Sequence, residues 1–229
     1  MIIKGLQKTT LLDFPGKVAC TVFTAGCNFR CPFCHNSALV VCPGQVDEIS
    51  EEDFFSYINK RKGILDGVAI TGGEPLLSHG IEDFIRRIKD TGLQVKLDTN
   101  GAFPDRLEAL LDAGLVDYVA MDVKNCKEKY ALTAGLSEYP EAIERSIEII
   151  VTKAPDYEFR TTVVRELHEA QDIVKIAEQL KGAKRYFLQA YIDSGDILCE
   201  GYSAYSAEEM LEILDKSRVL LPCTQLRGI

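Results

Sequence analysis

Three cysteines in one short run have the residue type and the spacing for redox chemistry. Cys27, Cys31 and Cys34 form the pattern Cys-x3-Cys-x2-Cys. Thiolates this close can each bind one iron of a [4Fe–4S] cluster, and such clusters usually have four cysteine ligands. Because no fourth cysteine completes the run, one iron would be left open to bind a small molecule. This arrangement favours chemistry on a bound cofactor over simple electron storage.

Two other uses of cysteine compete with this interpretation. The three cysteines and His35 could bind structural zinc as a Cys3His site, since short Cys-x-x-Cys spacings commonly hold zinc. Disulfides are the second alternative, but the chain is not a short secreted scaffold and its remaining cysteines are scattered. We expect most of these to be small buried residues, while the role of Cys42, close to the run, stays open. The cysteines outside the run are Cys20, Cys42, Cys126, Cys199 and Cys223.

A glycine pair follows the next predicted strand. The segment Thr71-Gly72-Gly73-Glu74-Pro75 comes directly after an apolar stretch at Gly67–Thr71. Paired glycines let a backbone approach a ligand closely, and the carboxylate of Glu74 could accept an ammonium group. The alternative is a tight turn with a solvated Glu74, because Gly-Gly is common in turns.

Charged residues mark the ends of the two strands that follow. Asp98 and Thr99 end one predicted strand, and Asp122 and Lys124 end the other. Since side chains alternate along a strand, Ala120, Asp122 and Lys124 share one face. The two aspartates could hold a cation or ribose hydroxyls, and Lys124 could pair with a ligand carboxylate. The alternative is a structural ion pair that is satisfied within the protein.

The last two predicted strands add further candidates. Arg160 and Thr162 share one face of the first of them, and Gln189 and Tyr191 share one face of the second. Each could line a ligand site or be an ordinary solvated or hydrogen-bonded residue, and the ordinary role is the one expected for Tyr191.

The arrangement of elements predicts an α/β fold. Short apolar runs alternate with helical patterns, which favours βα units around a parallel sheet. The predicted strands are Val18–Thr24, Gly67–Thr71, Leu93–Asp98, Tyr118–Val123, Glu158–Val164 and Arg185–Tyr191. The predicted helices cover residues 51–61, 79–90, 104–113, 139–152, 169–180 and 207–217. Because these units are two short of an eight-stranded barrel, we expect a partial (β/α)6 TIM-like barrel, with a flat doubly wound sheet as the alternative.

Size and composition set the broad class of protein. The 229 residues are 46% hydrophobic and 27% charged, which suits one globular domain over residues 1–229. The net charge of −9 argues against broad electrostatic binding to nucleic acid. No apolar run is long enough to span a bilayer, and the first residues lack a secretory signal pattern. We therefore expect a cytoplasmic protein that binds neither nucleic acid nor membrane.

The cysteine run and the Gly-Gly-Glu-Pro segment together resemble the radical S-adenosylmethionine superfamily. The aromatic Phe33 before the last cysteine also fits, and the combination is specific enough to disfavour zinc. Other segments resemble the enzymes that activate glycyl radical enzymes. They are similar to the group of anaerobic ribonucleoside-triphosphate reductase activating proteins and, more distantly, to pyruvate formate-lyase activating enzyme. These segments are Leu12-Asp13-Phe14-Pro15-Gly16, Cys34-His35-Asn36, Asp98-Thr99-Asn100-Gly101 and Met121-Asp122-Val123-Lys124.

The resemblance implies a reaction and its partners. The open iron of a [4Fe–4S] cluster would chelate the amino and carboxylate groups of S-adenosylmethionine, and the reduced cluster would pass one electron to the sulfonium. The resulting 5′-deoxyadenosyl radical would take a hydrogen atom from a glycine Cα of a partner glycyl radical enzyme. The partner implied is an anaerobic ribonucleoside-triphosphate reductase, and a flavodoxin or ferredoxin-type protein would donate the electron.

The resemblance also assigns roles to individual residues. The Gly72-Gly73-Glu74 segment would receive the methionine ammonium, and Lys124 would meet the methionine carboxylate. A monovalent cation beside the cofactor would have Asp98, Thr99, the Ala120 carbonyl and Asp122 as ligands. The further residues expected to contact the cofactor are Phe33, Arg160 and Gln189.

The chain also departs from this pattern. Arg185–Ile192 contains no histidine, so the ribose-contacting histidine of pyruvate formate-lyase activating enzyme has no clear equivalent. No inserted segment carries further cysteine clusters, so we expect a single cluster. The nearest rival is 7-carboxy-7-deazaguanine synthase, which typically has Cys-Asp-Thr where this chain has Cys34-His35-Asn36. A non-catalytic iron–sulfur carrier or a zinc-stabilised binding module is the rival from another class.

Overall fold

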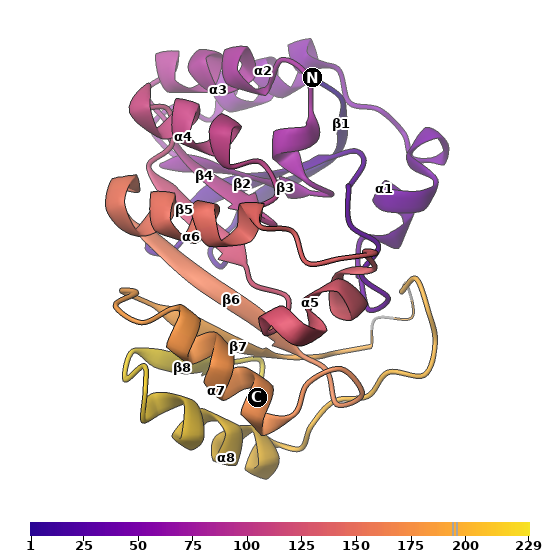
Figure 1. Cartoon of the computed structure of the whole chain (residues 1–229). Helices are drawn as coiled ribbons and strands as arrows, with labels where there is room; N and C mark the ends of the chain where they lie inside the picture. Colours follow the sequence, from indigo (N-terminus) through magenta and orange to yellow (C-terminus); the bar gives the residue numbers. More distant parts are fainter. Residues whose placement is uncertain (194, 196) are drawn as a thin grey trace.

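The computed structural model describes residues 1–193, 195 and 197–229 and shows a mixed α/β fold (Figure 1). The strands are β1 (Ile3–Thr10), β2 (Ala19–Thr24), β3 (Gly67–Gly72), β4 (Gln94–Thr99), β5 (Tyr118–Asp122), β6 (Tyr157–Val163), β7 (Tyr186–Ala190) and β8 (Thr224–Arg227). The α-helices are α1 (Ser37–Val41), α2 (Glu51–Lys60), α3 (Ile81–Asp90), α4 (Pro104–Asp112), α5 (Lys127–Ala134), α6 (Ala142–Lys153), α7 (Ala170–Gln179) and α8 (Ala207–Arg218). Short 3₁₀-helices lie at Pro43–Gln45 (η1) and Pro75–Leu77 (η2).

The strands lie in the sheet in chain order, from β1 to β8. β1 pairs antiparallel with β2, and the later neighbours pair parallel. Right-handed crossovers between successive parallel strands place their helices on one face of the sheet, and Figure 1 shows α3, α4, α6 and α7 following one another along that side. A doubly wound sheet would reverse its strand order instead. The predicted partial TIM-like barrel is therefore confirmed over the flat alternative.

The strand count differs from the prediction, because the sheet of the described residues has eight strands rather than six. The two additional strands, β1 and β8, lie at the edges of the sheet. Between its two buried end residues, β1 is half-buried or exposed, so its sequence lacks the apolar run of a central strand. β8 has only four residues, three of them polar or charged in type. Edge strands are commonly short and polar, so their sequences contain no apolar run by which they could be predicted.

Two helices also escaped prediction. α1 has five residues and α5 has eight, and neither shows a clear apolar stripe. Both follow the carboxyl end of a parallel strand, and α5 forms ion pairs with α6 and α7. Tertiary contacts rather than a strong intrinsic pattern stabilise such short helices.

The long helices hold the strands in place through apolar side chains with helical spacing. In α3, Ile81, Phe84, Ile85 and Ile88 are all buried. Burial of one such side chain stabilises the fold by roughly 1.5–3 kcal/mol. This packing fixes the strands and therefore the loops that follow their carboxyl ends. The helices of the described residues are not membrane spans, since none is long and apolar enough to cross a bilayer.

Candidate functional site

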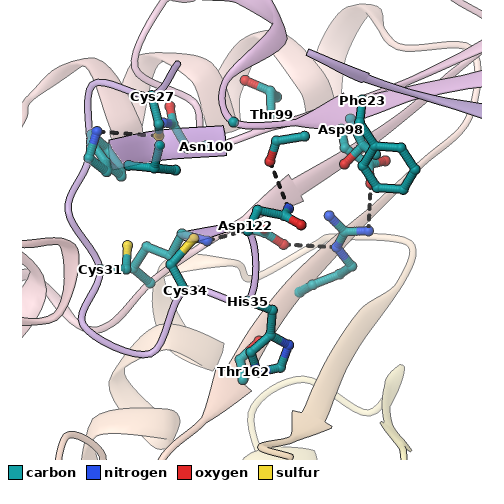
Figure 2. Close-up of a pocket in the computed structure, with 18 of the residues that line it drawn as sticks. Phe23, Cys27, Cys31, Cys34, His35, Asp98, Thr99, Asn100, Asp122 and Thr162 are labelled. Carbon is teal, nitrogen blue, oxygen red and sulfur yellow. Dashed lines mark hydrogen bonds and ion pairs between the residues drawn. The ribbon is translucent and has the colours of Figure 1, made fainter. Parts of the chain in front are cut away.

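A pocket of about 470 Å³ lies at the carboxyl ends of the parallel strands (Figure 2). Its walls come from the ends of several strands and from the segment between β2 and α1, residues 25–36, which we call the cysteine loop. The candidate residues that line the pocket are Cys27, Cys31, Phe33, Cys34, Gly72, Gly73, Asp98, Thr99, Asp122, Lys124, Arg160 and Gln189. The fold thus brings most of the candidates to one place, and only Glu74, Ala120 and Tyr191 of those named lie outside the lining.

The cysteine loop is anchored by its own apolar side chains. Phe29, Cys31 and Phe33 are buried in the main core, while Cys27 and Cys34 are half-buried beside the pocket. The Sγ of Cys27 accepts a hydrogen bond from the backbone N–H of Phe29 at 3.3 Å. Figure 2 shows the three cysteines of the loop on one side of the pocket. The loop therefore presents three thiols to one cavity.

These thiols suit an iron–sulfur cluster. All eight cysteines are free, so no disulfide uses the ligands. Burial raises the pKa of Cys31 to about 12, while the charge of Lys124 acts in the opposite direction. In the described part of the chain, no three His, Cys, Asp or Glu side chains converge tightly enough to hold a single metal ion. A [4Fe–4S] cluster spreads its cysteine ligands over separate irons, and three thiols lining one pocket fit that donor set.

The glycine pair brings the end of β3 into backbone contact with the cysteine loop. Gly72 has a φ of 114°, which side-chain-bearing residues rarely adopt. A Cβ atom added to Gly73 would lie 1.8 Å from the carbonyl oxygen of Gly26. That same oxygen accepts a hydrogen bond from the N–H of Glu74 at 2.8 Å. Only glycine fits this close approach, which also leaves the backbone open to the pocket.

The structure corrects the expected direction of the Glu74 carboxylate. This carboxylate is fully buried and lies outside the pocket lining. It accepts hydrogen bonds from Leu76 N at 3.0 Å, Thr99 Oγ1 at 3.0 Å and Asn100 N at 2.7 Å. Burial raises its pKa to about 7, although these donors favour the charged form. Glu74 therefore joins the ends of β3 and β4 instead of extending its carboxylate toward a ligand.

Asn100 extends this connection to the cysteine loop. Its Nδ2 donates to Asn28 Oδ1 at 2.9 Å and lies 3.7 Å from Cys27 Sγ. A donor near a thiolate favours the charged form. The sequence marks Asn100 only as part of a motif at a strand end, and its contact with the cysteine loop depends on the tertiary fold.

A group of charged side chains forms another wall of the pocket, and we call it the charged cluster. Arg160 Nε donates to Asp122 Oδ1 at 2.8 Å, and Arg160 Nη1 donates to Asp98 Oδ2 at 3.2 Å. Lys124 Nζ donates to Asp122 at 3.1 Å, and Lys96 pairs with Asp98. Burial raises the pKa of both aspartates, but the neighbouring cations outweigh it and hold both values below the usual range. The sequence analysis did not predict Lys96 as a member of this site, although Lys96 shares a strand face with Asp98.

The backbone of Lys124 is held in place by a buried histidine. His168 Nδ1 accepts a hydrogen bond from Val164 N at 3.1 Å. The other ring nitrogen, Nε2, therefore carries the proton and donates to Lys124 O at 2.7 Å. Burial lowers the pKa of His168, which favours this neutral form. No local motif marks His168, since its partner comes from the preceding strand.

The remaining candidates are placed as follows. Thr162 and Gln189 lie opposite each other on β6 and β7 and line the pocket. Ala120 is buried opposite Asp98 in the sheet. Tyr191 is buried rather than solvated, and its ring centroid lies 5.8 Å from that of His35.

With this geometry in hand, the comparison with known proteins defines the class. The chain belongs to the radical SAM superfamily, whose family pattern matches residues 21–180. The protein is accordingly a radical SAM enzyme rather than a non-catalytic binding module. Members of this family use a [4Fe–4S] cluster and S-adenosylmethionine. These are the two cofactors that the sequence resemblance implies for the residues of this pocket.

Individual relatives refine the comparison. A protein of Methanocaldococcus jannaschii, provisionally named a glycyl-radical enzyme activating enzyme, is 32% identical over 83% of this chain and 80% of its own length. A 7-carboxy-7-deazaguanine synthase of Hyperthermus butylicus is 40% identical, but over only 40% of this chain and 38% of its own. The crystal structure of a domain of pyruvate-formate lyase-activating enzyme from Bacteroides vulgatus superposes with a TM-score of 0.55. This structure is 18% identical and covers 71% of this chain and 99% of that chain, which supports the fold alone.

Proposed function

We propose that this protein activates a glycyl radical enzyme by taking a hydrogen atom from one of its glycines. The observation that carries the proposal is the convergence of three free cysteines, a glycine pair and a charged cluster on one pocket. The similarity to the M. jannaschii protein extends over most of both chains and supports this activity among those of radical SAM enzymes.

The pocket residues divide the work of binding. When bound, the cluster would supply one electron for the cleavage of S-adenosylmethionine, and the 5′-deoxyadenosyl group so released would accept the glycine hydrogen. The three cysteines of the cysteine loop hold the cluster. The half-buried backbone at Gly72 and Gly73 lines the pocket and would receive the ammonium of the cofactor, and Lys124 would pair with its carboxylate through a charge-assisted hydrogen bond. The other proposed cofactor contacts are Phe33, Arg160 and Gln189.

The proposed substrate is a glycine in a loop of a protein, specifically an anaerobic ribonucleoside-triphosphate reductase. The sheet is open between β1 and β8 in the described residues, which would leave a lateral gap for an inserted loop. A flavodoxin or ferredoxin-type donor would supply the electron, and the cytoplasm would be the site of the reaction. The similarity of the Asp13–Gly16 and Asp98–Gly101 segments to activating proteins supports this partner.

Two measurements on anaerobically reconstituted protein test the proposal. With S-adenosylmethionine and a reductant, the protein should form 5′-deoxyadenosine and methionine. When the glycyl radical enzyme of the same genome is added, electron paramagnetic resonance should show a glycine-centred doublet. Replacing Cys31 with serine should abolish both signals, whereas replacing the exposed Cys199 outside the pocket should leave them intact.

A second candidate function is a radical reaction on a small deazaguanine precursor. The partial match to the H. butylicus synthase supports it. The same reconstituted protein should therefore be incubated with that precursor in parallel. Turnover of the precursor without a glycyl radical on the protein partner would reject the activating function in favour of this one.

A further inference from the structure

The two aspartates of the charged cluster are already neutralised by the protein. The resemblance places a monovalent cation among Asp98, Thr99, the Ala120 carbonyl and Asp122, and that cation stays a prediction. In the structure both carboxylates are paired with side-chain cations. The hydroxyl of Thr99 donates a hydrogen bond to the buried Glu74 at 3.0 Å and accepts one from Gly101 N at 3.1 Å. These side chains therefore already have partners where a bound ion would need free oxygens.

Arg160 occupies the bridging position between the two carboxylates. The sheet register places Asp98 opposite Ala120 and Asp122 opposite Arg160. The guanidinium of β6 thus reaches Asp122 on β5, at 2.8 Å, and extends across that strand to Asp98 on β4, at 3.2 Å. A guanidinium is planar and permanently charged. One fixed group therefore joins the carboxylates of two neighbouring strands.

The charge balance of the cluster points the same way. Its cations are Arg160, Lys96 and Lys124, and its carboxylates are Asp98 and Asp122. Within this cluster three positive groups therefore face two negative ones. The nearby carboxylate of Glu158 does not alter this balance, because both its oxygens are paired with Arg227, at 2.7 and 2.8 Å. The charged cluster therefore lacks the excess of negative charge that would attract a further cation.

We propose that Arg160 takes the place of the monovalent cation, so that the protein binds S-adenosylmethionine without an added alkali ion. This inference rests on the proposed cofactor site. Arg160 lines the pocket, and a guanidinium has five N–H donors, of which the bonds to the two aspartates use two. The other donors are available to a ligand carboxylate, which is the contact that a bridging ion would otherwise make.

The first test measures the binding of S-adenosylmethionine in different salts. The full chain is reconstituted anaerobically and titrated in lithium, sodium, potassium and tetramethylammonium chloride at one ionic strength of about 0.15 M. The wild-type Kd should be the same in all four salts. Arg160→Gln should weaken binding by about 10- to 100-fold, with partial recovery in sodium or potassium. Arg160→Lys keeps the charge without the planar fork and should fall between the two.

The second test needs neither bound S-adenosylmethionine nor an activity assay. Thermal unfolding of the same reconstituted proteins is followed in the same four salts. The wild-type Tm should not depend on the cation, and Arg160→Gln should lower it by about 5–10 °C. The matched control is Arg86→Gln, which removes an arginine from an exposed ion pair with Glu82 on α3. This control should bind the cofactor like the wild type and show no specific response to alkali ions.

The outcomes separate this inference from the proposed function. A wild-type affinity that rises severalfold in sodium or potassium, and loses this rise in Asp98→Asn, would overturn the role of Arg160. Arg160→Gln with wild-type affinity and wild-type Tm would also overturn it. If Arg160→Gln does not fold, the affinity of the wild type for S-adenosylmethionine in the four salts still shows whether an alkali ion takes part in binding. If the wild type binds no S-adenosylmethionine, the proposed function fails, while the thermal series still tests the bridge.

Discussion

Replacing Glu74 with glutamine tests whether a buried carboxylate at this site titrates near neutral pH. Glu74 is fully buried, and burial raises its pKa from the ordinary 4.5 to about 7. Its oxygens accept hydrogen bonds from Leu76, Thr99 and Asn100. Glutamine has nearly the same shape and cannot titrate, so the two proteins differ chiefly in one ionisable proton.

The sign and size of the effect follow from proton linkage. A carboxyl whose pKa is higher in the folded than in the unfolded protein binds more protons when folded. The stability that it contributes is present below pH 4.5 and is lost as the pH rises through about 7. At about 1.4 kcal/mol per pKa unit, the full loss is about 3 kcal/mol. The glutamine variant has no such loss, so its free energy of unfolding should rise relative to wild type over this interval.

Glutamine also carries a cost that does not depend on pH. It has one acceptor oxygen and one amide NH₂ group, whereas the Glu74 carboxylate accepts from three donors. A buried donor left without an acceptor costs about 1–3 kcal/mol. The variant should therefore be less stable than wild type near pH 5 and comparable to it or more stable near pH 8.

Urea unfolding followed by circular dichroism, under anaerobic conditions from about pH 5 to about pH 8, measures this difference. The control variant is Glu82→Gln, which removes an exposed carboxylate from α3. A difference between wild type and Glu74→Gln that stays flat across the range would refute the raised pKa. A difference that changes in the opposite direction would show that the three hydrogen-bond donors outweigh burial.

Three further predictions concern the proposed site itself. The wild type reconstituted without oxygen should hold about four irons, Cys31→Ser should lose the cluster, and stoichiometric zinc without iron in the wild type would contradict the assignment. Lys124→Ala should keep the cluster but weaken S-adenosylmethionine binding by about 1–3 kcal/mol in calorimetry, so an unchanged affinity would reject its role. Gly73→Ala should destabilise the protein by about 1–3 kcal/mol in urea unfolding, because its Cβ would lie 1.8 Å from Gly26 O; wild-type stability would mean that the loop can move aside.

The central part of the fold was predictable because its strands carry their own signal. β3 is buried along its first four residues, and such strands appear in sequence as apolar runs between helical patterns. The edge strands carry no such signal. β1 is buried only at its two end residues, and β8 begins with Thr224 and ends with Arg227. Their pairing is decided by the neighbouring strand rather than by their own composition.

The candidate site was predictable where local spacing sets the geometry. The cysteine run and the glycine pair each lie within a few residues of chain, so their members must stay close together. The contacts of Glu74, Asn100 and His168 join different strands and loops. No single segment encodes the direction of such a side chain, which is why the Glu74 carboxylate was expected in the pocket.

Contacts between the cysteine loop and the rest of the protein should keep this loop folded when the iron–sulfur cluster is lost. Gly26 N donates to Leu39 O at 2.9 Å, and Asn36 Nδ2 donates to Gly72 O at 2.8 Å, so both ends of the loop are tied down. Asn100 donates a hydrogen bond to Asn28 in the first half of the loop, and Phe29 and Phe33 bury their rings in the core. None of these contacts requires a metal ligand. A cysteine variant of this loop should therefore report the loss of cluster binding in a folded protein, and the loop should already be ordered before a cluster binds.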